Sequence, residues 1–393
     1  MTMKKIVYTL LLVISCCMAC RQEDAQVTPV GKPIPGAPAP ATVKALLDSS
    51  NLTIYKAICQ RVNLDSILAA QQVAAYTLLV PSDSAFNAAG YTKAGIAGMN
   101  INDLDSLVLY HAIANPVNSS NLQQSLGNIA QYSMLTASDF ADYSPWSPYR
   151  YFLYLGIHQG KLMVNGHAHP LRALDGLDGT IYILDEVLKK PAFDMIDYLG
   201  SHAEFSQFLE AYHISDSTND DYIGYNIQDF LPLLTSSSQC APFTLIVPTN
   251  HAFAQAGLKT PDDFRALAGR SPMDYPNYRD IGGKTYYAAV FNPLDSMLFS
   301  THEDLSYFNR PSYPLVYFSN DFSDNGSLAN ALLMPGDLYR PPPVYMRLRF
   351  QQTGGKLLVN QLSPVFAPVP LTTTDIVCRN GVIHVIDDNL LAH

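Results

Sequence analysis

The sequence predicts a duplicated domain that contains both strands and helices, and three pairs of matching segments lead to this prediction. In each copy a YTLLVPSDSAF-like segment comes first, a KLMVN-like segment follows, and a DGTIYILDEVL-like segment comes last. Because the pairs keep one order at a domain-sized separation, they indicate a long-period repeat. The pairs are residues 76–86 with 243–253, 161–165 with 356–360, and 178–188 with 380–390.

The first segment of each copy, residues 76–86 and 243–253, predicts a strand that runs into a helix. Residues 243–247 alternate between apolar and polar positions as a half-buried strand does, and a proline-containing turn follows. Ser82 or Asp83 in the first copy, and Thr249 or Asn250 in the second, are natural helix N-caps, each contributing about 1 kcal/mol. We therefore interpret these polar residues as structural.

The last segment of each copy, residues 178–188 and 380–390, predicts a turn, a strand and an acidic bend. Val382, His384 and Ile386 fall on one face of this strand, because side chains alternate along a strand. The counterpart of His384 in the first copy is Tyr182. Exchange of histidine for tyrosine predicts a packing residue with a polar tip and not a ligand.

The paired segments resemble the fasciclin domain family, whose members carry a (Y/F)TLxxPxxxAF strand near the start and an NGVIHVID strand near the end. The resemblance covers roughly residues 43–190 and 191–391. It implies an α+β fold of two domains, each a β-sandwich or wedge of mostly antiparallel strands with helices packed alongside. It also implies an extracellular adhesion or binding role, without naming a ligand.

The family's middle motif is a Tyr-His pair after an apolar helix, and the first copy carries it as Tyr110 and His111. In animal members this region is implicated in adhesion. We expect His111 to pack in the core. In the second copy Ala288 replaces the histidine, so only the first copy could use the pair as a functional site.

The N-terminus resembles a bacterial lipoprotein export signal. Two lysines precede an apolar run at 6–14 that is shorter than the ~20 residues a membrane span needs. We predict lipidation at Cys20, with Cys16 as the alternative. The acidic stretch after Cys20 resembles surface-export signals of Bacteroidetes lipoproteins. The predicted parts are a signal peptide at 1–19, a proline-rich tether at 20–42, and domains at 43–190 and 191–393.

Charge and cysteine content exclude some classes of function. The formal net charge of −10 argues against a nucleic-acid-binding protein, which needs a basic surface. Beyond the predicted lipidation site Cys20 only Cys59, Cys240 and Cys378 remain, which is too few for a disulfide framework. We expect them to behave as small buried hydrophobic residues, although one pair could form a bridge.

The second copy contains additional residues, the largest share in mid-domain, and these additions are rich in tyrosine. Tyrosine suits both protein interfaces and sugar rings, since it joins a large contact area to a polar tip. Two alternatives stay open: the rings pack their own loops onto the domain, or they form an exposed recognition patch anchored on Trp146. The candidate binding residues are Trp146, Tyr149, Tyr151, Tyr275, Tyr278, Tyr313, Tyr339 and Tyr345.

No catalytic motif is evident, and we predict no cofactor and no metal site. The spacing of His167 and His169 would place both on one side of a strand, but no third ligand is obvious, so we predict a surface turn. The acidic run at 216–221 lacks the glycine and glutamate of a calcium loop and predicts a solvated loop.

The sequence therefore predicts a non-catalytic binding or adhesion lipoprotein, lipid-anchored in the outer membrane and exposed at the cell surface. The first hypothesis is a protein partner, either a neighbouring cell's surface or an outer-membrane nutrient-import complex in which this chain is an accessory subunit. The alternative is a glycan-binding protein that uses exposed aromatic residues. A hydrolase is a remote third hypothesis.

Overall fold

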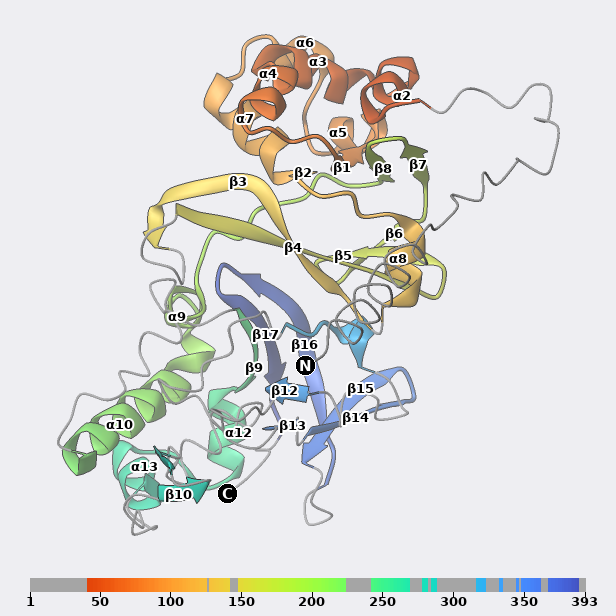
Figure 1. The fold of residues 1–393 in the computed structure, drawn as a ribbon. Helices are drawn as coiled ribbons and strands as arrows, with labels where there is room; N and C mark the ends of the chain where they lie inside the picture. The colour runs from red at the N-terminus through yellow and green to blue at the C-terminus, as the bar shows by residue number, and fades with distance from the viewer. Residues whose placement is uncertain are drawn as a thin grey trace, which may run out of the picture. The chain divides into compact units, whose positions relative to one another are not determined.

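A computed structural model describes most of the chain after residue 40, and it shows the predicted α+β fold (Figure 1). The chain divides into two units, Met1–Pro40 and Ala41–His393, and all described residues lie in the second unit. The described ranges are 41–125, 127–141, 148–223, 242–268, 278–281, 284–287, 316–322, 332–334, 344–345, 348–361 and 367–388.

The first repeat is built on an eight-stranded sheet with the order β6-β5-β4-β3-β2-β1-β8-β7. Neighbouring strands are antiparallel except for β1 and β8, which are parallel. The strands are β1 Tyr76–Pro81, β2 Ala112–Ile113, β3 Ile129–Ala141, β4 Pro148–His158, β5 Lys161–Val164, β6 His167–Pro170, β7 Ala173–Gly176 and β8 Gly179–Leu184.

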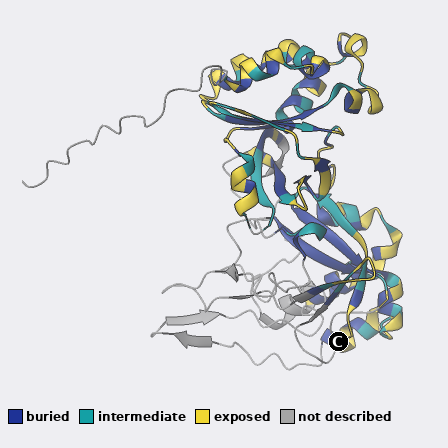
Figure 2. Cartoon of the chain, turned by 90° about the vertical axis from the view of Figure 1, so that its right-hand side faces the viewer, coloured by how far each residue is buried: buried dark blue, intermediate teal, exposed yellow. Residues whose placement is uncertain are grey.

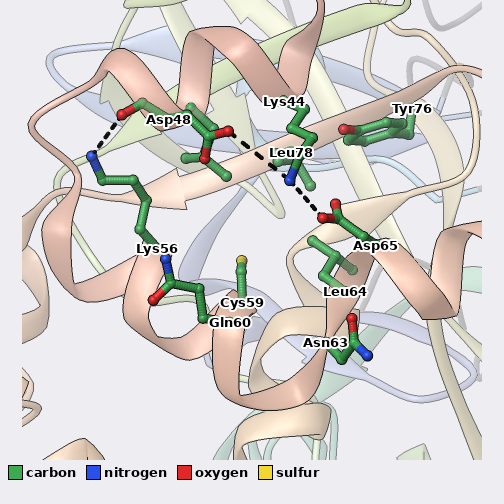
Figure 3. A pocket seen from close by; sticks show the side chains of 11 residues that line it. Lys44, Asp48, Lys56, Cys59, Gln60, Asn63, Leu64, Asp65, Tyr76 and Leu78 are labelled. Carbon is green, nitrogen blue, oxygen red and sulfur yellow. Dashed lines mark hydrogen bonds and ion pairs between the residues drawn. The ribbon is translucent and has the colours of Figure 1, made fainter.

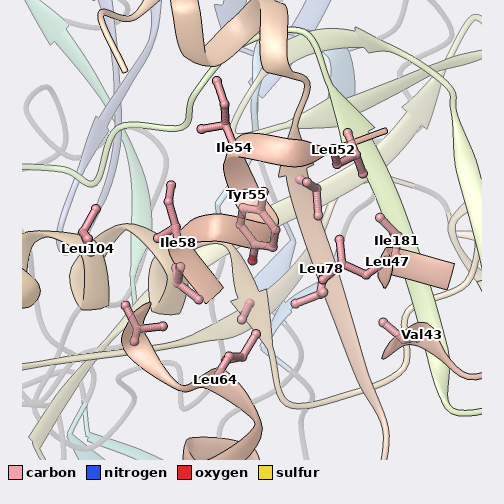
Figure 4. Close-up of a cluster of buried hydrophobic side chains, with 14 of the residues drawn as sticks. Val43, Leu47, Leu52, Ile54, Tyr55, Ile58, Leu64, Leu78, Leu104 and Ile181 are labelled. Carbon is pink, nitrogen blue, oxygen red and sulfur yellow. The ribbon is translucent and has the colours of Figure 1, made fainter. Parts of the chain in front are cut away.

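Short helices cover one end of this sheet, and a buried hydrophobic cluster fills the space between them and β1 (Figure 4). Tyr55 and Ile58 from α3, Leu104 from α7 and Leu78 from β1 meet there. The helices are α2 Val43–Ser49, α3 Thr53–Val62, α4 Leu64–Ala70, α5 Asp83–Ala88, α6 Lys93–Ile96, α7 Ile101–Tyr110 and α8 Ser119–Gln124.

The second repeat is built on a five-stranded sheet with the order β14-β15-β16-β17-β9. Its helices are α9 Met195–Gly200, η1 Ala203–Phe205, α10 Ser206–Ile223, α12 Asn250–Gln255, α13 Pro261–Ala268 and η2 Ser319–Asp321. Its strands are β9 Phe243–Pro248, β14 Leu348–Thr353, β15 Lys356–Gln361, β16 Val369–Cys378 and β17 Gly381–Ile386, with the two-stranded pairs β10 Tyr278–Ile281 with β11 Lys284–Tyr287, and β12 Leu332–Met334 with β13 Val344–Tyr345.

Each repeat has a central pair of parallel strands, β1 with β8 in the first and β9 with β17 in the second. In the first repeat Tyr76 lies opposite Gly179, and in the second Phe243 lies opposite Gly381. Both glycines have a φ of +147°, and a β-carbon would lie 1.7 Å from the Tyr76 carbonyl oxygen and 1.9 Å from that of Phe243. Only glycine permits this approach of two backbones, so the matching segments are equivalent in space as well as in sequence.

The strand β9 is buried on both faces, whereas its alternation predicts a half-buried strand. Leu245 and Val247 belong to one hydrophobic cluster, and Ile246 on the opposite face belongs to another. Figure 2 shows the same burial along the strands of both repeats, with exposed residues gathered on the outer helices. The prediction of half burial was wrong because a strand between two clusters needs apolar residues on both faces.

The predicted N-caps are confirmed at the first residue of each candidate pair. The Ser82 hydroxyl accepts a hydrogen bond from the Ala85 amide, and the Thr249 hydroxyl accepts one from the Ala252 amide. These hydrogen bonds satisfy amide groups that have no partner within the first turn of a helix.

Asp83 and Asn250, the other two cap candidates, bind the beginning of a different helix. The Asp83 carboxylate accepts the amide of Ile54 at 2.9 Å, at the start of α3. The Asn250 side-chain oxygen Oδ1 accepts a hydrogen bond from the amide of Gln207 at 2.8 Å, at the start of α10. Ile54 and Gln207 therefore occupy equivalent positions, and the helices α3 and α10 are counterparts.

Each repeat also joins its own beginning to its own end. The Asp178 carboxylate accepts the amide of Val43 at 2.6 Å, and the Asn380 side-chain oxygen accepts the amide of Met195 at 2.9 Å. These bonds engage the first amide of α2 and of α9, whose N-caps are Thr42 and Asp194. The domain boundaries at 43–190 and 191–393 stay a prediction.

The acidic run at 216–221 falls within the long helix α10 and not in the solvated loop that its composition predicts. The apolar side chains of Phe208, Ala211 and Tyr212 anchor the same helix in the core of the second repeat. No helix among the described residues is both long and apolar enough to cross a membrane.

Candidate functional site

The Tyr-His pair of the first repeat is buried. His111 donates from Nδ1 to the Leu107 carbonyl at 2.7 Å and accepts the Leu188 amide at Nε2, at 3.0 Å. Burial lowers the pKa of His111 to about 4, so the ring is neutral at physiological pH. The Tyr110 hydroxyl accepts a hydrogen bond from Asn165. These contacts give both residues a structural role.

Tyr149 and Tyr151, two of the candidate binding residues, do not present an exposed surface. Their exposed fractions are 5% and 3%. The Tyr149 hydroxyl donates to the Arg379 carbonyl of the second repeat at 2.6 Å, and the Tyr151 ring packs against Tyr110 at 5.8 Å. Both lie on β4, whose buried positions favour internal packing over recognition.

The remaining candidates cannot be placed in a site. The side chains of Tyr278 on β10 and Tyr345 on β13 are not described, although the strands themselves are. The other positions lie outside the described residues; they are Cys16, Cys20, Trp146, Tyr275, Tyr313 and Tyr339.

His167 and His169 lie on strand β6 and not in a surface turn, because both pair with residues of β5. The structure brings two carboxylates to them. His169 Nδ1 lies 2.6 Å from Asp185 Oδ1, and His167 Nδ1 lies 3.4 Å from Glu186 Oε1. Across the described ranges, no group of three or more histidine, cysteine or carboxylate side chains is arranged to hold a metal ion.

The two described cysteines are free thiols. Burial raises the pKa of Cys59 to about 12, and it raises the pKa of Cys378 as well. The thiolate is the nucleophilic form, so neither cysteine is an activated nucleophile at neutral pH. Cys240 lies outside the described residues.

A pocket of about 250 Å³ opens in the first repeat between α2, α3, α4 and β1 (Figure 3). Lys44 Nζ lies 2.5 Å from Asp65 Oδ2 and 4.0 Å from Asp48 Oδ2. Lys56 donates to the backbone carbonyls of Asp48 and Ser50 at 3.1 and 2.6 Å. The pocket therefore carries two positive and two negative side chains that are already paired with one another or with the backbone.

The interior of this pocket combines apolar side chains with a phenol and a thiol. Leu47, Leu64 and Leu78 supply apolar surface, and Cys59 and Tyr76 supply the polar groups. Burial raises the pKa of Tyr76 to about 12, so its hydroxyl keeps its proton. We did not predict this site from the sequence, because its lining comes from four separate elements. The available signal was the difference between Tyr76 and its counterpart Phe243.

The chain is similar to one known domain family and to a solved structure. Residues 50–190 match the family described as the fasciclin domain. A solved structure that the chain resembles is a FAS1 domain pair from the insect cell adhesion molecule fasciclin I. That likeness has 16% sequence identity, covers 87% of this chain and 96% of that chain, and has a TM-score of 0.30. No curated protein matches the chain.

The family match confirms the resemblance for the first copy. The second copy repeats the central strand register and the helix caps of the first, so the two copies share these features of their architecture. Fasciclin domains are found in cell adhesion proteins, which agrees with a binding role.

Proposed function

We propose that this chain is a non-catalytic binding protein of the bacterial cell surface. Two core histidines, His111 and His384, carry the proposal. His111 and His384 each have both ring nitrogens engaged by backbone groups, and burial lowers both pKa values. A general acid or base needs a nitrogen within reach of a substrate, and these two have none to offer.

The proposed attachment is a lipid anchor at Cys20, with Cys16 as the alternative, followed by a proline-rich tether that ends at residue 42. Acyl chains contribute about 0.8 kcal/mol for each buried methylene, so several chains hold a protein at a membrane. The acidic residues after Cys20 support export to the surface of a Bacteroidetes-type outer membrane.

The proposed partner is another protein, and the chain would act as an accessory subunit of an outer-membrane nutrient-import complex. The test is affinity purification of the tagged, lipidated chain from gently solubilised outer membranes, with co-purifying proteins identified by mass spectrometry. A transporter recovered in stoichiometric amount is the expected result. Recovery of the lipoprotein alone would contradict this partner.

Two cysteine variants serve as matched controls for the anchor. Cys20→Ser is expected to release the protein from the membrane fraction, whereas Cys16→Ser is expected to leave it membrane-bound. The opposite pattern would assign the lipid to Cys16. Membrane retention of the double variant would contradict lipid anchoring altogether.

Glycan binding is the second candidate. The observation that favours it is the pocket of the first repeat, whose lining includes the carboxylates of Asp48 and Asp65 and the amides of Gln60 and Asn63. Carboxylates accept hydrogen bonds from hydroxyl groups, and amides both accept and donate them, which makes this lining suitable for a sugar.

A further inference from the structure

We infer that the pocket of the first repeat binds an uncharged, hydroxyl-rich molecule of the size of a single sugar ring. The inference specifies the glycan-binding candidate and rests on the proposal that the chain binds without catalysing. Free monosaccharide and the terminal residue of a glycan share the required chemistry. Four observations lead to it: two differences between the repeats, the charge of the lining, and its size.

The first observation is a difference in side-chain size between the repeats at a position that lines the pocket. The hydrogen bonds from Asp83 and Asn250 make Ile54 and Gln207 equivalent, and the same spacing makes Cys59 the counterpart of Tyr212. Tyr212 is fully buried in the core of the second repeat. Cys59 has a much smaller side chain than tyrosine, and it lines the pocket.

The second observation is a hydroxyl that the fold does not need. Tyr76 is 7% exposed, and its hydroxyl makes no hydrogen bond to any residue that the structure describes. Its counterpart Phe243 fills the same position without a hydroxyl. Figure 3 shows the Tyr76 hydroxyl directed toward Lys44. This hydroxyl lines the pocket, so it can exchange a hydrogen bond with a ligand that enters there.

The third observation is that the charges of the lining cancel. Lys44 is paired with Asp65 and Asp48, and Lys56 with backbone carbonyls. A charged ligand would meet no complementary net charge and would have to separate the Lys44–Asp65 pair. A hydroxyl can instead donate to the carboxylate and accept from the ammonium or from Tyr76, so it joins the pair without breaking it.

The fourth observation is the size and the apolar wall. The volume of about 250 Å³ lies below the roughly 300–1,000 Å³ that holds a drug-sized ligand. Leu47, Leu64 and Leu78 offer apolar surface opposite the charged residues. One sugar ring has this composition, with an apolar C–H face and a polar rim of hydroxyls.

Two variants that copy the second repeat test the inference. Cys59→Tyr restores the ring found at Tyr212 and fills the pocket, and Tyr76→Phe removes only the hydroxyl, as at Phe243. Tyr198→Phe, in the second repeat, is the matched control. The full chain and each variant would be titrated with neutral methyl glycosides, by calorimetry and saturation-transfer NMR. Circular dichroism would verify folding.

We expect at least one methyl glycoside to bind the unaltered chain, about tenfold weaker or worse binding to Cys59→Tyr, and about fivefold weaker binding to Tyr76→Phe, as the loss of one neutral hydrogen bond implies. Tyr198→Phe should bind normally. The inference is overturned if no neutral glycoside binds, if Cys59→Tyr and Tyr76→Phe bind as well as the unaltered chain, or if free amino acids bind more tightly. Should Cys59→Tyr not fold, Tyr76→Phe alone decides.

Longer oligosaccharides separate the two sources of ligand. Equal binding of an oligosaccharide and its terminal methyl glycoside indicates a glycan end, whereas binding of the monosaccharide alone indicates a free sugar. The affinity purification from membranes separates this inference from the proposed function. Cys59→Tyr should retain a co-purifying protein partner, since the pocket and a protein interface are independent.

Discussion

Tyr182 and His384 form the same hydrogen bond in the two repeats, although their side chains differ. The Tyr182 hydroxyl donates to the Val117 carbonyl at 3.1 Å, and His384 Nε2 donates to the Tyr317 carbonyl at 2.9 Å. Both side chains are fully buried. The phenol and the neutral imidazole therefore have the same structural role, because each donates one hydrogen bond to a backbone carbonyl inside the core.

Removal of the Tyr182 hydroxyl is expected to destabilise the first repeat. Tyr182→Phe leaves the Val117 carbonyl buried without this donor, which costs about 1–3 kcal/mol. Urea denaturation followed by circular dichroism measures the change. Tyr91→Phe, at a partly buried ring that packs against Phe86, is the matched control and should change the free energy of unfolding by less. Equal effects of the two variants would contradict the role of the Tyr182 hydroxyl.

Stability is expected to decrease as pH falls from about 6.5 to about 4. The folded state lowers the pKa of His111 from 6.5 to about 4, so within this window the unfolded chain binds a proton that the folded chain does not. His111 contributes its full stabilisation above pH 6.5, and about 3 kcal/mol is lost by pH 4, at 1.36 kcal/mol per pKa unit.

The free energy of unfolding in urea, measured at several pH values, tests this dependence. His111→Gln should make the slope shallower without removing it, because His384 also has a lowered pKa. His158→Gln, at an exposed histidine at the end of β4, is the control and should leave the slope unchanged. A stability that rises on acidification through this window would refute the prediction.

The parallel strand pair is expected to tolerate no side chain at its glycine. Gly179→Ala would place a β-carbon 1.7 Å from the Tyr76 carbonyl oxygen, so the strands must separate and the loss should exceed about 4 kcal/mol. Gly90→Ala is the control, since Gly90 also has a positive φ but no atom within 4 Å of the added carbon. It should cost only about 1 kcal/mol. Thermal unfolding of both variants would separate steric overlap from backbone strain.

A test of the second-repeat additions should spare residues 316–322. Phe318 in this segment lies 5.3 Å from the Tyr154 ring, and Asp321 accepts the Asn128 amide at 2.8 Å, so the segment packs on the first repeat. A wider deletion, such as residues 300–350, would remove this segment and expose the surface that it covers.

Deletion of residues 324–347 keeps those contacts. If the additions form the interface, this shorter deletion abolishes capture of the outer-membrane partner and leaves the first repeat folded, as affinity purification and circular dichroism would show. Retained capture by a folded variant would contradict the interface. Deletion of residues 224–241, a segment of similar size between α10 and β9, is the control and should retain the partner.

The sequence predicts contacts that depend on one strand or one turn. The caps at Ser82 and Thr249, and the packing role of His384, follow from local pattern and from comparison of the two copies. Contacts between distant segments were not predicted. The pocket is the clearest case, because Lys44, Cys59 and Tyr76 meet only after three helices pack on β1.

The aromatic candidates show the other limit of sequence reasoning. Tyrosine composition alone cannot distinguish a ring that packs inside from one that faces a partner. Tyr149 and Tyr151 lie at alternate positions of a strand that is buried along most of its length, and the hydroxyl of Tyr149 is used within the chain. A longer alternation between apolar and polar residues would have been needed to identify an exposed face.

The hydrogen bonds from Asp178 to Val43 and from Asn380 to Met195 hold the two ends of each repeat together. Residues added between those ends therefore need not change the hydrogen bond that joins the ends. The second copy could therefore lengthen in mid-domain over evolutionary time without disturbing the junction with its neighbour. Its closure explains how one gene duplication could yield two modules of unequal length on the same scaffold.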